Sequence, residues 1–205
     1  MSTIRLLLIA TLAAAAAAPA AAHHMIGGAL PATFAEGLLS GLGHPIIGHD
    51  HLLAILAVGA LASLFTRGVL LPVAFVAAAL VGVGLHVGLV DLPAAELLIA
   101  VSLVVLGALL LAPPAAVPAP ALVALFALAG IVHGYAFGES IVGAEPAPLV
   151  AYLLGLGMVQ TGIALLAWAG ARLLGRRAPD VAPWAMRGFA LMVMVVGVTA
   201  MLAGA

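Results

Sequence analysis

The sequence predicts an all-α fold: a polytopic membrane protein with six transmembrane helices after a cleaved signal peptide, and a short amphipathic periplasmic helix before the first span. Of the 205 residues, 66% are hydrophobic and only 6% are charged. The mean hydropathy is +1.37, a value that soluble domains of this size do not carry. Six apolar segments have about the 17–25 residues that a bilayer requires, or slightly more. They cover residues 45–66, 69–89, 95–112, 119–138, 147–174 and 183–203.

Residues 1–22 are typical of a secretory signal peptide. Arg5 is followed by apolar residues and a long alanine run, and small residues fit an A-x-A cleavage site after Ala20 or Ala22. An uncleaved first helix is the alternative, because the alanine run is long for the apolar core of a signal peptide. We therefore expect residues 23–205 to form a single six-helix transmembrane domain.

The segment 27–43 precedes the first apolar run and is mixed in polarity. Phe34, Leu38, Leu39 and Leu42 recur at helical spacing, which favours a short amphipathic helix lying at the membrane surface. This helix would lead directly into the polar stretch that opens the first span.

The charged residues separate onto two sides of the predicted bundle. A cleaved signal peptide leaves the mature amino terminus outside, so the connections at Arg67, 113–120 and 172–187 are expected to be cytoplasmic. Every arginine of the mature chain lies in them, in keeping with the positive-inside rule. The opposite side carries Glu36, Asp50, Asp91, Glu96, Glu139, Glu145, His23, His24, His44, His49, His51, His86 and His133. We expect a multi-pass protein of the bacterial inner membrane, with both mature termini in the periplasm.

The residue types that are missing exclude several classes of function. The chain has no Cys, which excludes disulfides, thiolate metal sites and Cys nucleophiles. All six basic residues are arginine, so neither a P-loop lysine nor a Schiff-base lysine is present. The chain therefore has no ATPase motif, and its net charge of -1 gives no reason to expect a nucleic acid partner. A lipid bilayer is the expected surrounding, and a homo-oligomer is compatible with the sequence.

The stretch from His44 to His51, His-Pro-Ile-Ile-Gly-His-Asp-His, opens the first apolar run. Ionisable groups cost about 2.5–3.5 kcal/mol at the centre of a span and are usually functional. Neutral imidazoles, here His44, His49 and His51, together with the carboxylate of Asp50 suit divalent transition ions. A metal site is therefore one interpretation. The alternative is a polar helix entrance, with His44 as its cap and Asp50 facing water.

The position of Pro45 suggests how these residues are arranged. If Pro45 is the first helical residue, His44, Gly48 and His51 share one helix face, and Gly48 leaves space between the two imidazoles. Asp50 then points about 100° away from His51. That direction leaves Asp50 a flanking role or a hydrogen bond to a metal ligand.

A second polar group ends the fourth apolar segment. His133 lies about one and a half turns before Glu139, and a loosened last turn could let Glu139 fold back towards it. Gly130 and Gly134 form a small-residue stripe that suits close packing of a neighbouring helix. A hydrogen bond between helices is the alternative role for His133. For His86, which lies among glycines in the second segment, metal ligation and helix packing are equally compatible.

Both polar stretches resemble the motifs of a known family. Residues 44–51 match the HP-x-x-G-x-D-H motif of the HupE/UreJ family, and residues 133–138 resemble its second motif, F-H-G-x-A/V-x-G-x-E. Val132 stands where the second motif has its aromatic residue. The final acid of that motif falls on Ser140, with Glu139 one position early. The signal peptide followed by six apolar segments also resembles the family.

The resemblance implies a secondary permease that imports Ni²⁺ or Co²⁺ for enzymes such as hydrogenase or urease. The divalent ion is then a substrate rather than a cofactor, and the protein is not an enzyme. The implied metal-binding residues are His44, Asp50, His51 and His133, with Glu139, His49 and His86 as further candidates. A non-transporting accessory protein that binds metal for metalloenzyme assembly is the alternative, because the inner halves of the helices are almost purely apolar. An intramembrane metalloenzyme should carry an H-E-x-x-H helix, which the sequence lacks.

Overall fold

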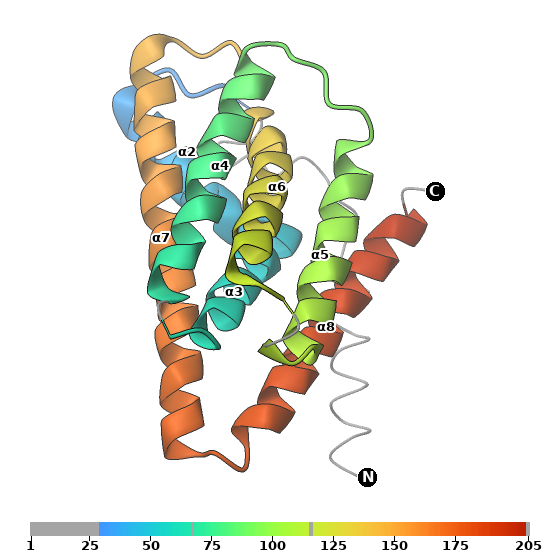
Figure 1. Cartoon of the computed structure of the whole chain (residues 1–205). Coiled ribbons are helices and arrows are strands. Elements are labelled where there is room, and N and C mark those ends of the chain that lie inside the picture. Colours follow the sequence, from blue (N-terminus) through green and yellow to red (C-terminus); the bar gives the residue numbers. More distant parts are fainter. Residues whose placement is uncertain (1–28, 67, 115–116, 204–205) are drawn as a thin grey trace, which may run out of the picture.

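The computed structural model describes residues 29–66, 68–114 and 117–203, and every regular element within these ranges is helical (Figure 1). The predicted all-α class is thereby confirmed. The predicted signal peptide, with His23 and His24 after it, lies outside the described residues. In chain order the elements are α2 (Phe34–Ile47), α3 (His49–Ser63), the 3-10 turn η1 (Gly68–Leu70), α4 (Leu71–Val87), α5 (Ala95–Leu111), α6 (Ala119–Gly138), α7 (Pro146–Arg177) and α8 (Ala182–Ala203).

Four stretches of helix are each long and apolar enough to cross a bilayer, namely η1 with α4, and α6, α7 and α8. Helices α2 and α3 reach that length only as a pair, and the pair is bent by 79°. Helix α5 is apolar but has 17 residues, at the lower limit of the roughly 17–25 residues that span a bilayer. The described residues thus contain four or five candidate spans, and the number six stays a prediction.

The prediction that Pro45 opens the first span is wrong. The helix starts earlier because Thr33 and Glu36 cap it reciprocally: Thr33 Oγ1 accepts from the Glu36 N–H, and Glu36 Oε2 accepts from the Thr33 N–H. Pro45 lies inside the last turn of α2, where it has no N–H to donate to the preceding turn. Gly48 then separates the helices, donating to the carbonyl of His44 and accepting from the N–H of Leu52. The segment predicted to be helical before the first span is thus part of α2, which runs on into the first half of the histidine motif and ends at Ile47; its place at a membrane surface stays a prediction.

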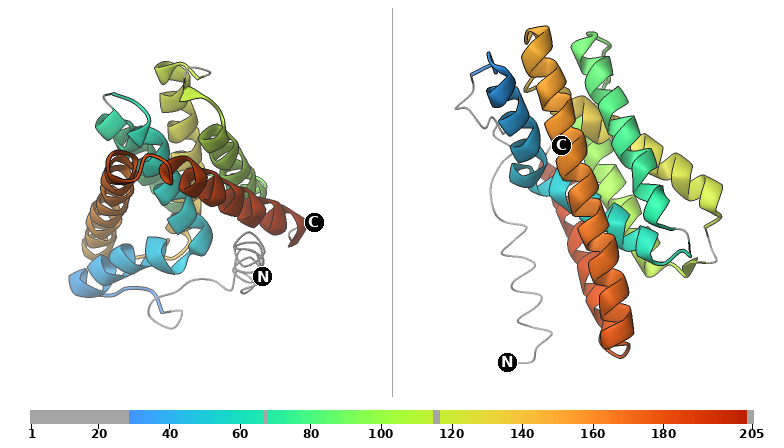
Figure 2. Two further views of the ribbon diagram at one scale, coloured as in Figure 1. Left: turned by 90° about the horizontal axis from the view of Figure 1, so that it is seen from below. Right: turned by 90° about the vertical axis from the view of Figure 1, so that its left-hand side faces the viewer.

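Glycines bring the helices that carry the polar residues into close contact. Gly134 and Gly130 of α6 lie against the backbone of Ala79 and Phe75 in α4, so the predicted small-residue stripe is a packing face. Helix α2 packs in the same way along the first half of α7, with Gly41 against the backbone of Tyr152. Figure 2 shows both pairs side by side. A methyl group at any of these glycines would overlap the neighbouring backbone.

The connections between helices gather at two ends of the bundle (Figure 1). At one end lie the start of α2 and the α4–α5 and α6–α7 connections. We call it the acidic end because these segments carry Glu36, Asp91, Glu96, Glu139 and Glu145. At the other end α7 turns into α8. We call it the arginine end because that region carries Arg172, Arg176, Arg177 and Arg187, with Asp180. The predicted charge separation is present in the fold, and the orientation in a membrane stays a prediction.

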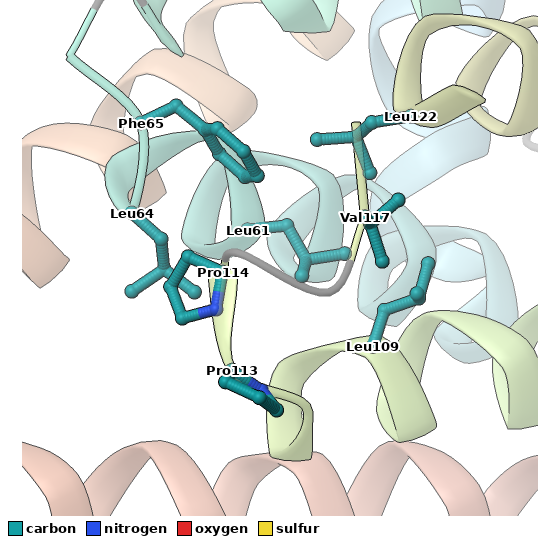
Figure 3. A pocket seen from close by; sticks show the side chains of 8 residues that line it. All are labelled: Leu61, Leu64, Phe65, Leu109, Pro113, Pro114, Val117 and Leu122. Atoms are coloured by element: carbon teal, nitrogen blue, oxygen red, sulfur yellow. The ribbon is translucent and has the colours of Figure 1, made fainter. Parts of the chain in front are cut away.

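Helix α3 ends among apolar side chains. Figure 3 shows Leu61, Leu64 and Phe65 facing Leu109 of α5, Leu122 of α6 and residues of the α5–α6 connection. They enclose a cavity of about 10 Å³, which is room for about one water molecule. The polar start of α3 and its apolar end therefore lie in different surroundings.

Candidate metal centre

Three histidines from three different helices meet inside the bundle. His44 comes from the last turn of α2, His51 from the first turn of α3 and His133 from α6. Their side chains are 6%, 5% and 0% exposed, respectively. The Nδ1 atoms of His51 and His133 are 2.7 Å apart, and the ring of His44 lies edge-on to that of His51 with centroids 6.1 Å apart. We call these residues the histidine cluster.

Aromatic rings hold the cluster from the sides. Phe137 of α6 contacts both His44 and His51, with ring centroids 5.1 and 4.3 Å away. Phe75 of α4 lies 5.9 Å from the ring of His133. Because these rings cannot accept strong hydrogen bonds, the polar interactions of the imidazoles run towards one another and towards a few hydroxyl groups.

The hydroxyl groups around His44 orient its ring. Nδ1 of His44 lies 3.0 Å from both Ser140 Oγ and Tyr152 Oη. Tyr152 donates its own proton to the carbonyl of Phe137 at 2.7 Å, so its oxygen is an acceptor for His44. This arrangement favours the tautomer of His44 that carries its proton on Nδ1 and its lone pair on Nε2.

A similar argument fixes His133. Nε2 of His133 lies 2.9 Å from Ser102 Oγ of α5, and that hydroxyl donates to the carbonyl of Ile99 at 2.7 Å. His133 therefore donates from Nε2 and keeps its lone pair on Nδ1, where it accepts the proton of His51 Nδ1. In this favoured tautomer the lone pair of His133 Nδ1 faces His51 Nδ1, and the two nitrogens share one proton.

The separation of the two nitrogens can be compared with that of two imidazoles bound to one metal ion. Two nitrogens bound to one metal ion at about 2.0–2.1 Å lie about 2.9–3.4 Å apart for bond angles between about 90° and tetrahedral. The observed 2.7 Å between His51 and His133 is only slightly shorter. Within the described ranges, however, no three His, Asp or Glu side chains converge into a group ready to hold a metal ion. The cluster is thus a histidine pair with a third histidine beside it, and not a closed cage.

Gly48 and Asp50 flank the pair from the start of α3. A methyl group on Gly48 would lie 2.7 Å from Cδ2 of His51, so the missing side chain makes room for the imidazole. The expectation that His44 and His51 share one helix face with Gly48 between them is wrong, because the two histidines lie on separate helices. Asp50 is half-buried and accepts a hydrogen bond from the backbone N–H of His51 at 2.9 Å. A carboxylate in this position also stabilises the first turn of the helix.

The remaining predicted residues lie apart from the pair. His49 is exposed at the start of α3. His86 donates from Nδ1 to the carbonyl of Tyr135 at 2.8 Å and packs its ring on that of Tyr135, which joins α4 to α6. Glu139 is exposed at the end of α6, whereas the next residue, Ser140, is buried against His44. The serine thus occupies the inward position, and Glu139 does not fold back.

Sequence reasoning missed the hydroxyl groups of Ser102 and Tyr152, and it also missed Gln160. The signal was the presence of isolated polar residues in otherwise apolar spans, which is itself a mark of function. Gln160 lies on the buried stripe of α7, about two turns after Tyr152. Its side chain is 0% exposed, and its amide atoms have no hydrogen-bond partner among the described residues.

A helical bundle with several apolar spans and buried polar groups from different helices defines a membrane protein with a polar site in its interior. Residues 10–200 match the model of the family described as HupE / UreJ protein. The chain belongs to this family. Protein HupE of Rhizobium leguminosarum bv. viciae is 33% identical over 138 residues, which cover 62% of this chain and 72% of that relative. No solved structure matches the chain.

Proposed function

We propose that this protein is a secondary permease that imports Ni²⁺ or Co²⁺ across the bacterial inner membrane, and that the ion passes through the histidine cluster from the periplasmic side. The family is associated with nickel or cobalt uptake or with hydrogenase and urease maturation. The observation that carries the proposal is the buried contact of 2.7 Å between His51 and His133, with His44 edge-on beside it.

The chemistry of the cluster suits this class of ion. Imidazole nitrogen is a borderline ligand that binds Ni²⁺ and its neighbours in the transition series, whereas soft Cu(I) prefers thiolates and thioethers. The chain has no cysteine. A divalent ion would replace the proton between His51 and His133, and His44 would add a third nitrogen after a small movement of its ring. Passage requires an ion that can also leave, so an incomplete ligand set fits a permease better than a closed cage.

A route to the cluster begins at the acidic end. The carboxylates at that end would raise the local concentration of cations. Asp50, which lies beside His51, would balance the charge of an ion as it loses water to the histidines. Protons compete with metal ions for imidazole nitrogen, so protonation of the cluster would favour release.

A non-transporting accessory protein that binds metal for hydrogenase or urease assembly is the second candidate function. The observation that favours it is the apolar packing at the end of α3 (Figure 3), which lies on the inward side of the cluster in the proposed orientation. Such a protein would use the same histidines and would need no polar route beyond them.

Uptake of radiolabelled Ni²⁺ and Co²⁺ into proteoliposomes distinguishes the two functions. We expect the purified wild-type protein to accumulate one of the ions, and the double variant His51→Ala, His133→Ala to lose that uptake. Thr161→Val changes an exposed position of α7 and is the control for insertion and folding. Binding of metal without any accumulation, even under an imposed proton gradient, would refute the permease and favour the accessory protein.

A further inference from the structure

A second polar site lies at the arginine end, far along the chain from the histidine motifs. The ends of α3, α5 and α7 and the start of α8 surround a cavity of about 560 Å³, a size within the roughly 300–1,000 Å³ of small-molecule sites. Arg172 and Arg176 of α7 and Arg187 of α8 line it, and no acidic residue is among the described residues of its wall. The other walls are largely apolar and include Leu64, Leu110 and Met186.

The length of α7 places this cavity at the level of lipid headgroups. Its 32 residues extend over about 48 Å at about 1.5 Å per residue, whereas the hydrocarbon core of a bilayer is about 30 Å thick. Because Arg176 and Arg177 lie in the last turn and charged side chains are costly within a bilayer, we take this end of α7 to be the one that extends beyond the hydrocarbon. Figure 2 (left) looks onto this end of the bundle, where α7 meets α8.

Each of the two tryptophans of the chain contacts one of these arginines. The guanidinium group of Arg172 lies over the ring of Trp168 at 5.4 Å, and that of Arg187 lies over Trp184 at 5.2 Å. Trp184 is 71% exposed. Exposed tryptophan is enriched where the hydrocarbon meets the headgroups, so the ring of Trp184 supports a headgroup-level position for this end of the bundle.

The clustering of three arginines is not explained by helix ends alone. Arg176 lies in the last turn of α7, where a cation complements the negative end of the helix dipole. Arg187 is the sixth residue of α8, beyond the first turn to which the dipole effect is confined, so the helix end gives no reason for a cation there. Three guanidinium groups around one cavity repel each other, and an anion among them would relieve that repulsion; their planar forks match phosphate oxygens.

We propose that the cavity binds an anionic phospholipid of the adjacent leaflet. The phosphate lies among Arg172, Arg176 and Arg187, near the amino-terminal end of α8, which also attracts anions. The first part of an acyl chain lies on the apolar wall formed by Leu64, Leu110 and Met186. Basic pockets between helices are a known form of lipid recognition. This site is independent of the proposed ion transport, because none of its residues belongs to the histidine cluster.

The two tryptophans make the proposal directly testable. The full protein is reconstituted into phosphatidylcholine vesicles that contain a small fraction of either brominated phosphatidylglycerol or brominated phosphatidylcholine. Bromine quenches tryptophan fluorescence on contact, so the ratio of the two quenching values reports the local preference for the anionic lipid. We expect phosphatidylglycerol to quench the wild-type protein several-fold more strongly. Equal quenching by the two lipids would overturn the proposal.

Neighbouring arginines supply the matched control. Arg176→Gln is expected to bring the ratio close to one, whereas Arg177→Gln removes the same charge outside the cavity wall and is expected to keep the preference. An equal loss in both variants would mean a general surface attraction and would refute the site. A third arm adds inorganic phosphate: relief of the quenching by phosphate would assign the cavity to a soluble anion instead of a lipid. Because the lipid comparison is made within each variant, altered baseline fluorescence does not affect the ratio.

Discussion

The Nδ1 atoms of His51 and His133 lie 2.7 Å apart although the two residues are 82 positions apart in the chain. Only one of the two nitrogens can carry the proton, and the contact between His133 Nε2 and Ser102 favours the tautomer in which it is His51. A cation that enters the pair therefore meets one lone pair already in place and one proton that must move. The nearby hydroxyl groups thus set the chemistry of the imidazoles.

Removal of the Ser102 hydroxyl should weaken metal binding. Ser102→Ala leaves His133 Nε2 without its acceptor, and loss of such a supporting hydrogen bond typically lowers metal affinity by about 10–100-fold. Titration calorimetry with Ni²⁺ on the purified protein measures the effect. Ser63→Ala is the control. Its hydroxyl, like that of Ser102, donates to a carbonyl of its own helix, but Ser63 is the last residue of α3, whereas His51 lies in the first turn of that helix. An unchanged affinity in Ser102→Ala would mean that Ser102 does not set the tautomer of His133.

A methyl group at Gly48 should displace the His51 ring. The backbone angle φ of Gly48 is −73°, which alanine adopts freely, so the effect is steric: the new Cβ would lie 2.7 Å from His51 Cδ2. We expect Gly48→Ala to fold and to lose most ion uptake. Gly84→Ala is the matched control, since no atom lies within 4 Å of its Cβ position. Equal uptake by the two variants would contradict the proposed position of His51 on the ion route.

Gln160 should show opposite effects on stability and on transport. A buried amide without partners costs about 1–3 kcal/mol, and both amide atoms of Gln160 lack partners among the described residues. We expect Gln160→Leu to raise the melting temperature and to lower uptake, because a polar group kept at such a cost in a span is usually functional. Thr161→Val controls for substitution at the neighbouring position. Greater stability with full uptake would exclude Gln160 from the ion route.

His86 should affect stability more than metal binding. Its Nδ1–H joins α4 to the carbonyl of Tyr135 in α6, and hydrogen bonds between membrane helices average about 0.6 kcal/mol, with a maximum of about 1.7. His86→Phe keeps an aromatic ring beside Tyr135 and removes the hydrogen bond. We expect a lower melting temperature and a smaller change in Ni²⁺ affinity than Ser102→Ala gives. A loss of affinity at unchanged stability would make His86 a ligand after all.

The sequence was sufficient for the features that depend on local pattern. Apolar segments of bilayer length predicted the helices from α4 to α8 to within a few residues, and the Gly130 and Gly134 spacing predicted a packing face. The predicted start of the first helix at Pro45 was wrong. The helix begins at Phe34, where Thr33 and Glu36 cap it, and the preference of proline for the first turn of a helix did not decide the boundary. The helix therefore starts eleven residues before Pro45, and the break between α2 and α3 falls after it, at Gly48.

The sequence alone determined the membrane character of the chain, its family motifs and the residue types of its candidate site. Only the tertiary structure decided that His44 and His51 belong to two helices bent at 79°, that Ser140 rather than Glu139 faces inward, and that Ser102 and Tyr152 orient the imidazoles. The physical reason is that periodicity reports which face of a helix is buried, whereas the partner of a buried polar group is set by how separate helices cross. Those crossings depend on close contacts such as Gly134 against Ala79, which join residues far apart in the chain.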